Sequence, residues 1–321
     1  MRLTIRIAAP AFAAILVAAC SAGASPAPSQ GAAAPSASQA AVASPSAEVT
    51  PAPTVDPCAK ANLTVIAAGK LTVGTDNPAY SPYWLPRDGG NMPPWDTEFS
   101  GDPTTGTGFE SAVAYAVADK LGFTKDEVAW TPVKFDNSYA PGPKPFDFYL
   151  AQVSYTAERA QTADLSDGYY SLNQALVGVS GSAIASAKTL ADLQSYQFGA
   201  QAGTTSYDTI VNLIKPSKEP RVYDSNDAAI TALNNKQIDG LVVDLPTAFY
   251  VTAAQMDNGV IVGQFAPTGS EQEHFSMVLA KDSPLTACVN QALATMTSDG
   301  TLDAITKEWM SDKANAPVIQ P

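Results

Sequence analysis

The sequence predicts an α/β fold with mainly parallel sheets flanked by helices. Short apolar runs that are typical of buried strands alternate along the chain with segments whose apolar residues recur at helical spacing. Apolar residues make up 45% of the 321 residues and charged residues 15%, so most of the chain is able to bury a core. This length corresponds to about two domains.

The strands are predicted from short apolar runs. They are expected at residues 71–75, 128–133, 146–154, 176–179, 198–200, 221–223, 240–244, 260–262 and 275–280. The helices are predicted from apolar residues at helical spacing, as for Phe109, Val113 and Val117, and Ser225 is a suitable N-cap for one of them. They are expected at residues 109–121, 206–214, 226–234, 246–256, 284–297 and 301–310.

The start of the chain indicates a targeting signal. Arg2 and Arg6 precede an apolar run at 7–19. The length of this run suits a signal sequence better than a membrane span. The run ends in Val17-Ala18-Ala19-Cys20, which resembles the lipobox of bacterial lipoproteins, in which cleavage precedes the Cys and its sulfur is lipid-modified. We expect a signal peptide at 1–19 and a lipid on Cys20. The alternative is an ordinary secretory signal with an incidental Cys.

Residues 20–56 are expected to be the lipidated Cys and a disordered tether. Ala, Ser and Pro fill 25 of the 36 positions from 21 to 56, and none is aromatic. Such a segment cannot bury enough apolar surface to offset the entropy lost on ordering. A lipid and a tether together indicate that the folded part works close to a membrane surface.

Composition excludes several classes of site. The 31 acidic and 18 basic residues give a net charge of −13, which lacks the clustered cations of a nucleic-acid surface. The single histidine, His274, excludes multi-His metal sites and leaves one possible base for a catalytic triad. Three cysteines are too few for an all-cysteine zinc site or iron–sulfur cluster. We therefore expect no metal site and no cofactor.

Polar residues follow or end several of the predicted strands. In open α/β sheets, ligands bind beyond the carboxyl ends of the strands. Asp76, Ser154, the turn at 203–206 and Asp244 all lie at such ends. We therefore expect them to form one binding constellation.

Two charged residues indicate what this constellation binds. Once a signal peptide is removed, the arginines are Arg87, Arg159 and Arg221. Arg159 lies at the start of a predicted short helix near Ser154, where a guanidinium suits a carboxylate; a surface ion pair is the alternative. Asp244 either caps the following helix or accepts hydrogen bonds from a ligand ammonium. Together, Arg159 and Asp244 would suit the zwitterion of an α-amino acid.

Several motifs occur in an order that resembles a known family. They are Gly74-Thr-Asp-Asn-Pro-Ala-Tyr-Ser-Pro-Tyr83, Thr156-Ala-Glu-Arg159, Asp164-Leu-Ser-Asp-Gly-Tyr-Tyr170, Gln201-Ala-Gly-Thr-Thr-Ser206, Ile238-Asp-Gly-Leu-Val-Val-Asp244 and Asp299-Gly-Thr-Leu-Asp-Ala-Ile305. This series resembles the polar amino-acid solute-binding proteins of ABC importers, family 3. The resemblance extends over about 69–310, nearly the whole predicted folded part.

The resemblance implies a two-lobe, periplasmic-binding-protein-like fold in which two hinge crossovers join the lobes. The first lobe would comprise 57–172 and 264–321, and the second lobe 173–263. The crossovers would lie near 171–174 and 263–267. Cys58 and Cys288 would then flank the folded part outside the reducing cytosol, where a disulfide between them is expected; two buried free thiols are the alternative.

The resemblance also assigns ligand-binding positions. Arg159 would hold the α-carboxylate and Asp244 the α-ammonium. Tyr80 and Phe109 match two aromatic positions that enclose the ligand side chain, with core packing as the alternative, and Asp76 matches an acid that contacts a polar or cationic end. The remaining positions that it assigns to the ligand are Gln152, Ser154, Thr204, Thr205 and Ser206.

The sequence departs from the family pattern in three places. Glu110 stands where Asp is frequent, and Ala151-Gln152 where small Ser or Gly residues are frequent. The insertion at 84–107 contains Trp84 and Trp95, and it either walls the pocket or decorates the surface. These departures affect the specificity for the side chain more than the zwitterion site.

The function implied is that of an extracytoplasmic, lipid-anchored, monomeric receptor at a bacterial cell membrane. It would capture a free, polar or cationic L-amino acid by hinge closure and deliver it to the transmembrane subunits of an ABC permease, without catalysis. Alternatives are an enzyme on the same fold, similar to cyclohexadienyl dehydratases, and a receptor that serves a separate sensor. An enzyme acting on a ring acid would not need an ammonium acceptor, so the presence of both Arg159 and Asp244 favours the receptor.

Overall fold

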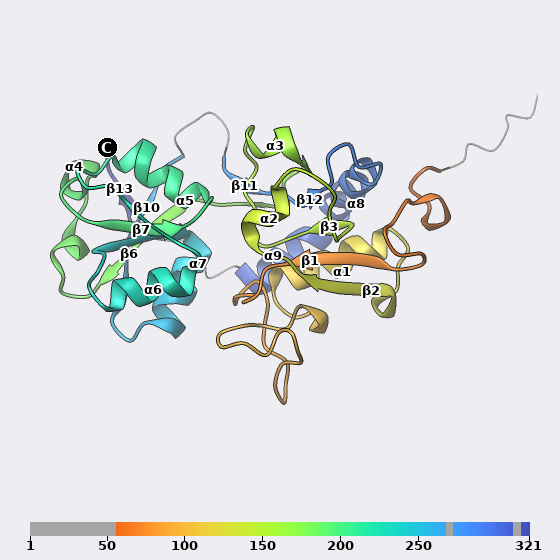
Figure 1. The fold of residues 1–321 in the computed structure, drawn as a ribbon, viewed down its shortest axis with the longest axis horizontal. Coiled ribbons are helices and arrows are strands. Elements are labelled where there is room, and N and C mark those ends of the chain that lie inside the picture. The colour runs from red at the N-terminus through yellow and green to blue at the C-terminus, as the bar shows by residue number, and fades with distance from the viewer. Residues whose placement is uncertain (1–55, 268–271, 311–315) are drawn as a thin grey trace, which may run out of the picture. The chain divides into compact units, whose positions relative to one another are not determined.

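The computed structural model describes residues 56–267, 272–310 and 316–321. The predicted signal peptide, Cys20 and nearly all of the predicted tether lie outside these residues. The described chain forms two open sheets, each flanked by helices, which build two lobes (Figure 1). We call residues 56–172 and 274–310 the first lobe, and residues 173–265 and 316–321 the second lobe.

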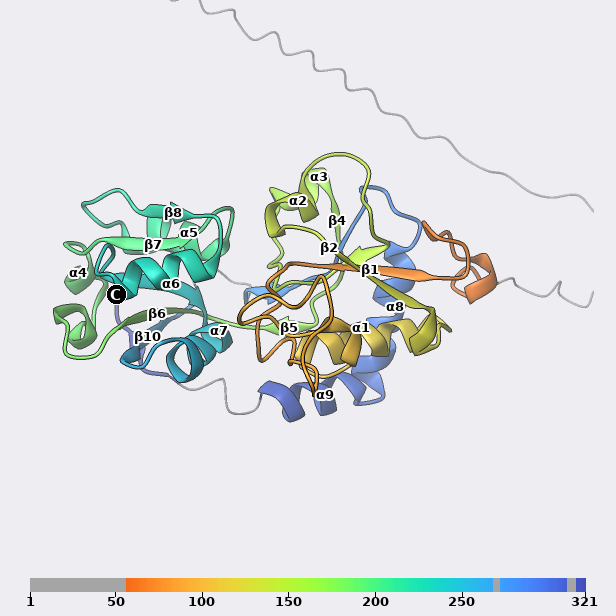
Figure 2. The same cartoon turned by 60° about the horizontal axis from the view of Figure 1, so that its bottom comes forward.

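The sheet of the first lobe has five strands in the order β2-β1-β3-β12-β4. Their bounds are β1 (Leu71–Thr75), β2 (Val128–Pro132), β3 (Phe148–Tyr149), β4 (Asp164–Leu165) and β12 (Val278–Leu279). The helices of this lobe are α1 (Phe109–Lys120), α2 (Phe135–Tyr139), α3 (Arg159–Thr162), α8 (Thr286–Ser298) and α9 (Thr301–Met310). Figure 2 shows α1 and α9 on one side of β1, and α2 and α3 on the other. The sheet is thus covered on both faces, and all five residues of β1 are buried.

The sheet of the second lobe has six strands in the order β13-β10-β6-β9-β7-β8. They are β6 (Gln174–Val179), β7 (Phe198–Gln201), β8 (Arg221–Tyr223), β9 (Gly240–Asp244), β10 (Gly259–Phe265) and β13 (Val318–Ile319). The helices are α4 (Leu190–Leu193), α5 (Thr205–Thr209), α6 (Asn226–Asn234) and α7 (Leu245–Tyr250). Successive strand residues face opposite cores: Val177 packs in the core that α6 and α7 share, and Leu176 in the core on the other face.

Two short strands accompany the crossovers between the lobes. β5 (Tyr170–Ser171) pairs antiparallel with β11 (His274–Phe275), so the outgoing and returning segments lie side by side. Short 3-10 helices lie at Lys60–Asn62, Pro103–Thr105, Lys125–Glu127 and Ala183–Ser186, and π-helical turns at Ile210–Ile214 and Val251–Gln255.

The two-lobe α/β fold agrees with the prediction, but the sheets are mixed rather than mainly parallel. β6 runs antiparallel to both of its neighbours, β9 and β10. β6 carries the chain into the second lobe, and β10 carries it out. β12, which follows the return crossover, is antiparallel to β3 and β4.

Four expected boundaries are corrected by the structure. The strand expected at 146–154 is limited to β3, and the helices expected at 206–214 and 246–256 each change to a π-helical turn after about half of their length. The expected boundary 264–321 implied that the end of the chain belongs wholly to the first lobe, but it does not. β13 instead pairs in parallel with β10 and extends the sheet of the second lobe.

A disulfide joins Cys58 to Cys288 on α8, with a Cα–Cα distance of 5.3 Å. It connects residues that are 230 positions apart, so it fastens the beginning of the described chain to a late helix of the same lobe. Cys288 is buried in the main core of the first lobe, and Cys58 packs against that core.

Candidate functional site

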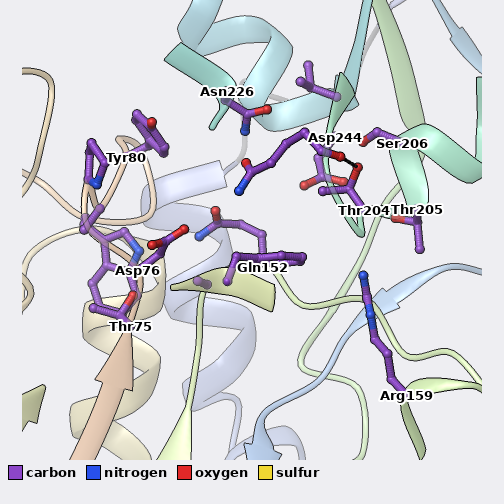
Figure 3. Close-up of a pocket in the computed structure, with 17 residues that line it drawn as sticks. Thr75, Asp76, Tyr80, Gln152, Arg159, Thr204, Thr205, Ser206, Asn226 and Asp244 are labelled. Atoms are coloured by element: carbon purple, nitrogen blue, oxygen red, sulfur yellow. Dashed lines mark hydrogen bonds between the residues drawn. The ribbon is translucent and has the colours of Figure 1, made fainter. Parts of the chain in front are cut away.

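Residues from both lobes line one pocket (Figure 3). The first lobe contributes Thr75, Asp76, Pro78, Ala79, Tyr80, Trp84, Phe135, Ala151, Gln152 and Arg159. The second lobe contributes Gln201, Thr204, Thr205, Ser206, Asn226, Val243 and Asp244. Asp76 and Tyr80 lie toward one end of the pocket, and Arg159 and Thr205 toward the other (Figure 3).

Arg159 is a buried cation that is held from several sides. The hydroxyl of Thr156 accepts a hydrogen bond from the Arg159 backbone N–H at 3.1 Å, which fixes the beginning of α3. The guanidinium donates from Nη1 to the Ser154 carbonyl at 2.5 Å and from Nη2 to the Gly203 carbonyl at 2.7 Å. It also lies over the ring of Tyr139, 4.7 Å from the centroid. Because a guanidinium has five N–H donors, these bonds leave donors for a ligand anion.

Gln152 is held in a strained backbone conformation by Glu110. Its φ is +55°, a left-handed value that is uncommon for residues other than glycine. The Glu110 carboxylate accepts the backbone N–H of Gln152 at 2.7 Å, and also the Gln152 side-chain amide and the hydroxyl of Tyr169. Burial raises the pKa of Glu110 from 4.5 to about 7 despite these bonds. Glu110, which departs from the family pattern, thus supports the pocket residue Gln152.

Asp244 ends β9 and lines the pocket without capping the helix that follows. Its side chain makes no capping hydrogen bond to α7, so the cap alternative is not supported. Instead, Asp244 Oδ1 accepts a hydrogen bond from Gln174 Nε2 at 2.7 Å. Burial, followed by the nearby charge of Glu273, raises the pKa of Asp244 well above its ordinary value.

Asp76 follows β1 directly, at the end of the strand where the sequence predicted a polar site residue. Its carboxylate accepts a hydrogen bond from the Asn77 backbone N–H at 2.8 Å. Burial raises the pKa of this carboxyl from 3.8 to about 6. Tyr80 lies close to it, and burial raises the pKa of its phenol. The end of the pocket near Asp76 is therefore acidic and partly shielded from water.

Two predicted ligand residues lie elsewhere. Phe109 has no exposed surface and packs in the core against the rings of Tyr169 and Tyr170, 6.1 and 5.2 Å between centroids. This is the core-packing alternative, and it follows from the position of Phe109 on the buried face of α1. Ser154 is also buried, and its hydroxyl donates to Glu273 at 2.6 Å rather than lining the pocket.

The eight other predicted residues, Asp76, Tyr80, Gln152, Arg159, Thr204, Thr205, Ser206 and Asp244, line the pocket together. Sequence reasoning missed Phe135, Gln201 and Asn226, which also line it, and named Trp84 only as part of an insertion that either walls the pocket or decorates the surface. Gln201 and Asn226 each follow or end a strand of the second lobe, so the rule that placed Asp244 applies to them as well. Phe135 and Trp84 carry no such signal, because their places depend on how distant loops pack.

The insertion at 84–107 contributes one residue, Trp84, to the pocket. The rest of it braces the loop that carries Asp76 and Tyr80. Asn77 Nδ2 donates to the Pro94 carbonyl at 2.7 Å, and Ser100 Oγ accepts the Ala79 backbone N–H at 3.0 Å. Gly101 is required for this packing, because a Cβ there would lie 2.1 Å from the carbonyl oxygen of Trp84.

Comparison with known proteins identifies the family. Residues 89–312 match the family described as bacterial extracellular solute-binding proteins, family 3. The chain belongs to this family. The match to family 3 begins after Asp76 and Tyr80. The assignment of these two residues to the site therefore depends on the structure of the pocket and not on the family match. Among the described residues of this family 3 protein, every helix is too short or too polar to cross a membrane.

Relatives of this family 3 protein are amino-acid-binding proteins. The L-cystine-binding protein TcyJ of Escherichia coli (strain K12) is 31% identical over 224 residues, which cover 68% of this chain and 79% of that protein. An ancestral arginine-binding protein bound to arginine is 28% identical with a TM-score of 0.61, over 75% of this chain and 98% of that chain. The ancestral amino acid-binding protein AncCDT-1, a precursor of cyclohexadienyl dehydratase, is 27% identical with a TM-score of 0.59, over 75% and 95%.

Proposed function

We propose that this family 3 protein captures a free amino acid and delivers it to the transmembrane permease of an ABC importer. The observation that carries the proposal is that Arg159 of the first lobe and Asp244 of the second lobe line the same pocket. A guanidinium and a carboxylate on two sides of one pocket match the two charges of an amino-acid zwitterion. A ligand held by both lobes favours the closed arrangement of the lobes, since it gains contacts that the open arrangement lacks.

The α-carboxylate is proposed to bind between Arg159 and the beginning of α5. The first N–H groups of a helix have no partner within the helix, so those of Thr205 and Ser206 are suited to an anion. Thr204 orients this turn, because its hydroxyl accepts the Tyr207 backbone N–H at 3.3 Å. The α-ammonium is proposed to bind Asp244, whose carboxylate is not used as a helix cap.

The ligand side chain is proposed to extend toward Asp76 and to be polar or cationic. Asp76 lies at the end of the pocket away from Arg159 (Figure 3). A cationic group would offset the cost of burying an ionised Asp76 carboxylate. The relatives named for binding arginine and L-cystine, whose side chains end in charged groups, support this choice.

The protein is proposed to be a monomer held outside the cytoplasm by a lipid on Cys20 after removal of 1–19. The lipobox-like sequence and the Ala/Ser/Pro-rich segment that follows support this anchoring. Metabolic labelling with palmitate, compared between the wild type and Cys20→Ser, tests it. Label that persists in the Ser variant would contradict lipidation at Cys20.

An enzyme on this fold and a receptor for a separate sensor are the alternatives. AncCDT-1 shows that the family lies close to a dehydratase lineage. An enzyme acting on a cyclohexadienyl acid needs a residue that binds a carboxylate but no residue that accepts from an ammonium. The presence of Asp244 in the pocket therefore favours the receptor. We therefore propose no catalytic residue. A permease and an ATPase encoded beside the gene would favour import over sensing.

A thermal-shift panel tests the proposal directly. The full-length protein in mild detergent is heated with each common amino acid and with L-cystine, because a ligand that binds only the native state raises the melting temperature. We expect a shift with one or a few polar or cationic amino acids, and its loss in Asp244→Asn. Conversion of a cyclohexadienyl acid to an aromatic product, with no amino acid giving a shift, would instead establish the enzyme.

A further inference from the structure

Glu273 accepts hydrogen bonds from both lobes. It precedes β11 on the segment that returns from the second lobe to the first. Its Oε1 accepts a hydrogen bond from Ser154 Oγ of the first lobe and another from Thr205 Oγ1 of the second lobe, each at 2.6 Å. A hydroxyl has one proton to donate, so the two hydroxyl groups that the sequence assigned to the ligand donate to Glu273 instead.

Gln174 connects this carboxylate to the site for the ligand ammonium. Its Nε2 donates to Asp244 Oδ1 at 2.7 Å and also lies 3.1 and 3.2 Å from the two carboxylate oxygens of Glu273. Its Oε1 accepts the Ser206 hydroxyl at 2.7 Å, which fixes the orientation of the amide. Gln174 is buried, so the two carboxylates share one amide group away from solvent.

We propose that Glu273 is a positioning residue that couples capture of the ligand ammonium by Asp244 to the release of a proton from the site. The inference rests on the proposed function, in which Asp244 accepts the α-ammonium. In the coupled step, the proton leaves the Asp244 carboxylic acid for solvent, and the resulting carboxylate accepts hydrogen bonds from the ligand ammonium. No other bond forms or breaks.

The physical reason is repulsion between like charges. Two oxygens bonded to one nitrogen at these distances lie at most about 6 Å apart, close enough for the charge of one carboxylate to disfavour ionisation of the other. In agreement, burial and the charge of Glu273 are the two largest causes that raise the pKa of Asp244. The other charged or titratable groups that face Asp244 are Glu110 and Arg159 and the phenols of Tyr83, Tyr169 and Tyr170.

The sign of the effect follows from these charges. A ligand ammonium binds the ionised form of Asp244, so affinity rises with pH until Asp244 is ionised in the free protein. Glu273 moves that midpoint to higher pH. Removing its charge therefore moves the midpoint to lower pH, whereas loss of a purely structural contact would change affinity equally at every pH.

The test measures the titration of Asp244 directly. Full-length protein is labelled with 13Cγ-aspartate, and the Asp244 signal is assigned as the one lost in Asp244→Asn. In Glu273→Gln, which keeps the size and the hydrogen-bonding oxygen, we expect the Asp244 midpoint to fall by about one pH unit or more. The Asp76 signal provides an internal reference and should not move. An Asp244 midpoint that is the same in the wild type and in Glu273→Gln would overturn the proposal.

Two control variants separate charge from contact. Ser154→Ala removes a donor to Glu273 but leaves its charge, so the Asp244 midpoint should stay raised. Glu308→Gln removes an exposed charge on α9 and should leave the midpoint unchanged. A fall of the midpoint in Ser154→Ala as large as in Glu273→Gln would show that packing, not charge, is responsible, and would overturn the proposal.

A second measurement tests the coupling to the ligand. L-arginine is titrated into the wild type and Glu273→Gln by calorimetry at the pH of the wild-type Asp244 midpoint found in the 13C titration, in two buffers of different ionisation enthalpy. Fewer protons should be released in Glu273→Gln, and equal release would overturn the coupling. If the wild type does not bind L-arginine, this amino acid is excluded as the ligand, and the 13C titration still decides the role of Glu273.

Discussion

Arg159 and Gly203 join the two lobes through a hydrogen bond of 2.7 Å from the guanidinium Nη2 to the carbonyl oxygen. The hydroxyl of Tyr139 donates to the same carbonyl at 3.1 Å, and the Tyr139 ring lies against the guanidinium. The cation that is proposed to hold the ligand carboxylate is therefore fixed by groups from both lobes. This arrangement reduces the side-chain entropy that Arg159 would lose on binding a ligand.

Replacement of this arginine should abolish binding. Leaving a buried charge without its partner typically costs about 3–5 kcal/mol, which is more than a hundredfold in affinity. We expect this loss in Arg159→Ala, measured by calorimetry with the amino acid that gives the largest thermal shift. Arg159→Lys should also bind poorly, because an ammonium cannot form the forked bonds of a guanidinium. Wild-type affinity in both variants, with unchanged circular dichroism, would exclude Arg159 from the site.

Asp244 should be required for closure of the lobes. In Asp244→Asn the size is kept but the charge is lost, so the ligand retains its contacts with Arg159 and loses those that distinguish the closed state. Small-angle scattering should show the wild type contracting with ligand, and the Asn variant contracting less at matched occupancy. Equal contraction would mean that other contacts drive closure.

The affinity for a cationic amino acid should fall in acid because of Asp76. Its carboxyl has a pKa of about 6 in the folded protein, and the ligand cation pairs with the ionised form only. Ionisation of Asp76 should therefore add a step near pH 6 to the profile of L-arginine affinity, beside the contribution of Asp244, and below this step the affinity should fall by up to about tenfold for each pH unit. Asp76→Asn should bind L-arginine more weakly and lose this step of the pH profile. The same step in the variant would assign it to another group.

Loss of the disulfide should lower stability more than binding. Cys58 and Cys288 are 230 positions apart, and neither lines the pocket. Removal of a native disulfide typically costs about 2–5 kcal/mol, chiefly by freeing the unfolded chain. We expect the double variant Cys58→Ser with Cys288→Ser to unfold at lower denaturant concentration while it keeps its ligand affinity. An unchanged midpoint would show that this bond does not contribute to stability.

The sequence was informative where a local rule fixes a residue in space. Asp76 and Asp244 come at the carboxyl ends of buried strands, so their positions in the pocket followed from the alternation of strands and helices. Ser225 caps α6 as predicted, with its hydroxyl accepting the Ala228 backbone N–H at 3.2 Å. The antiparallel pairing of β6 and the place of β13 were not predicted, because strand direction depends on where the crossovers lie.

The site was harder to predict where a residue acts through long-range contacts. Glu273 is 119 positions from Ser154 and 68 from Thr205, and no spacing in the sequence indicates that they meet. The family resemblance assigned Phe109 to the pocket, with core packing as the alternative, and its place on the buried face of α1 directs it into the core. Only the packing of the folded chain distinguishes these cases.

The disulfide and β13 together make the protein suitable as an optical biosensor. The disulfide secures the chain near Cys58 to the first lobe, whereas β13 is part of the sheet of the second lobe. Two fluorophores, one attached near Lys60 and one near Val318, would therefore report on different lobes. Energy transfer between them would follow the motion of one lobe against the other, and neither label would occupy the pocket.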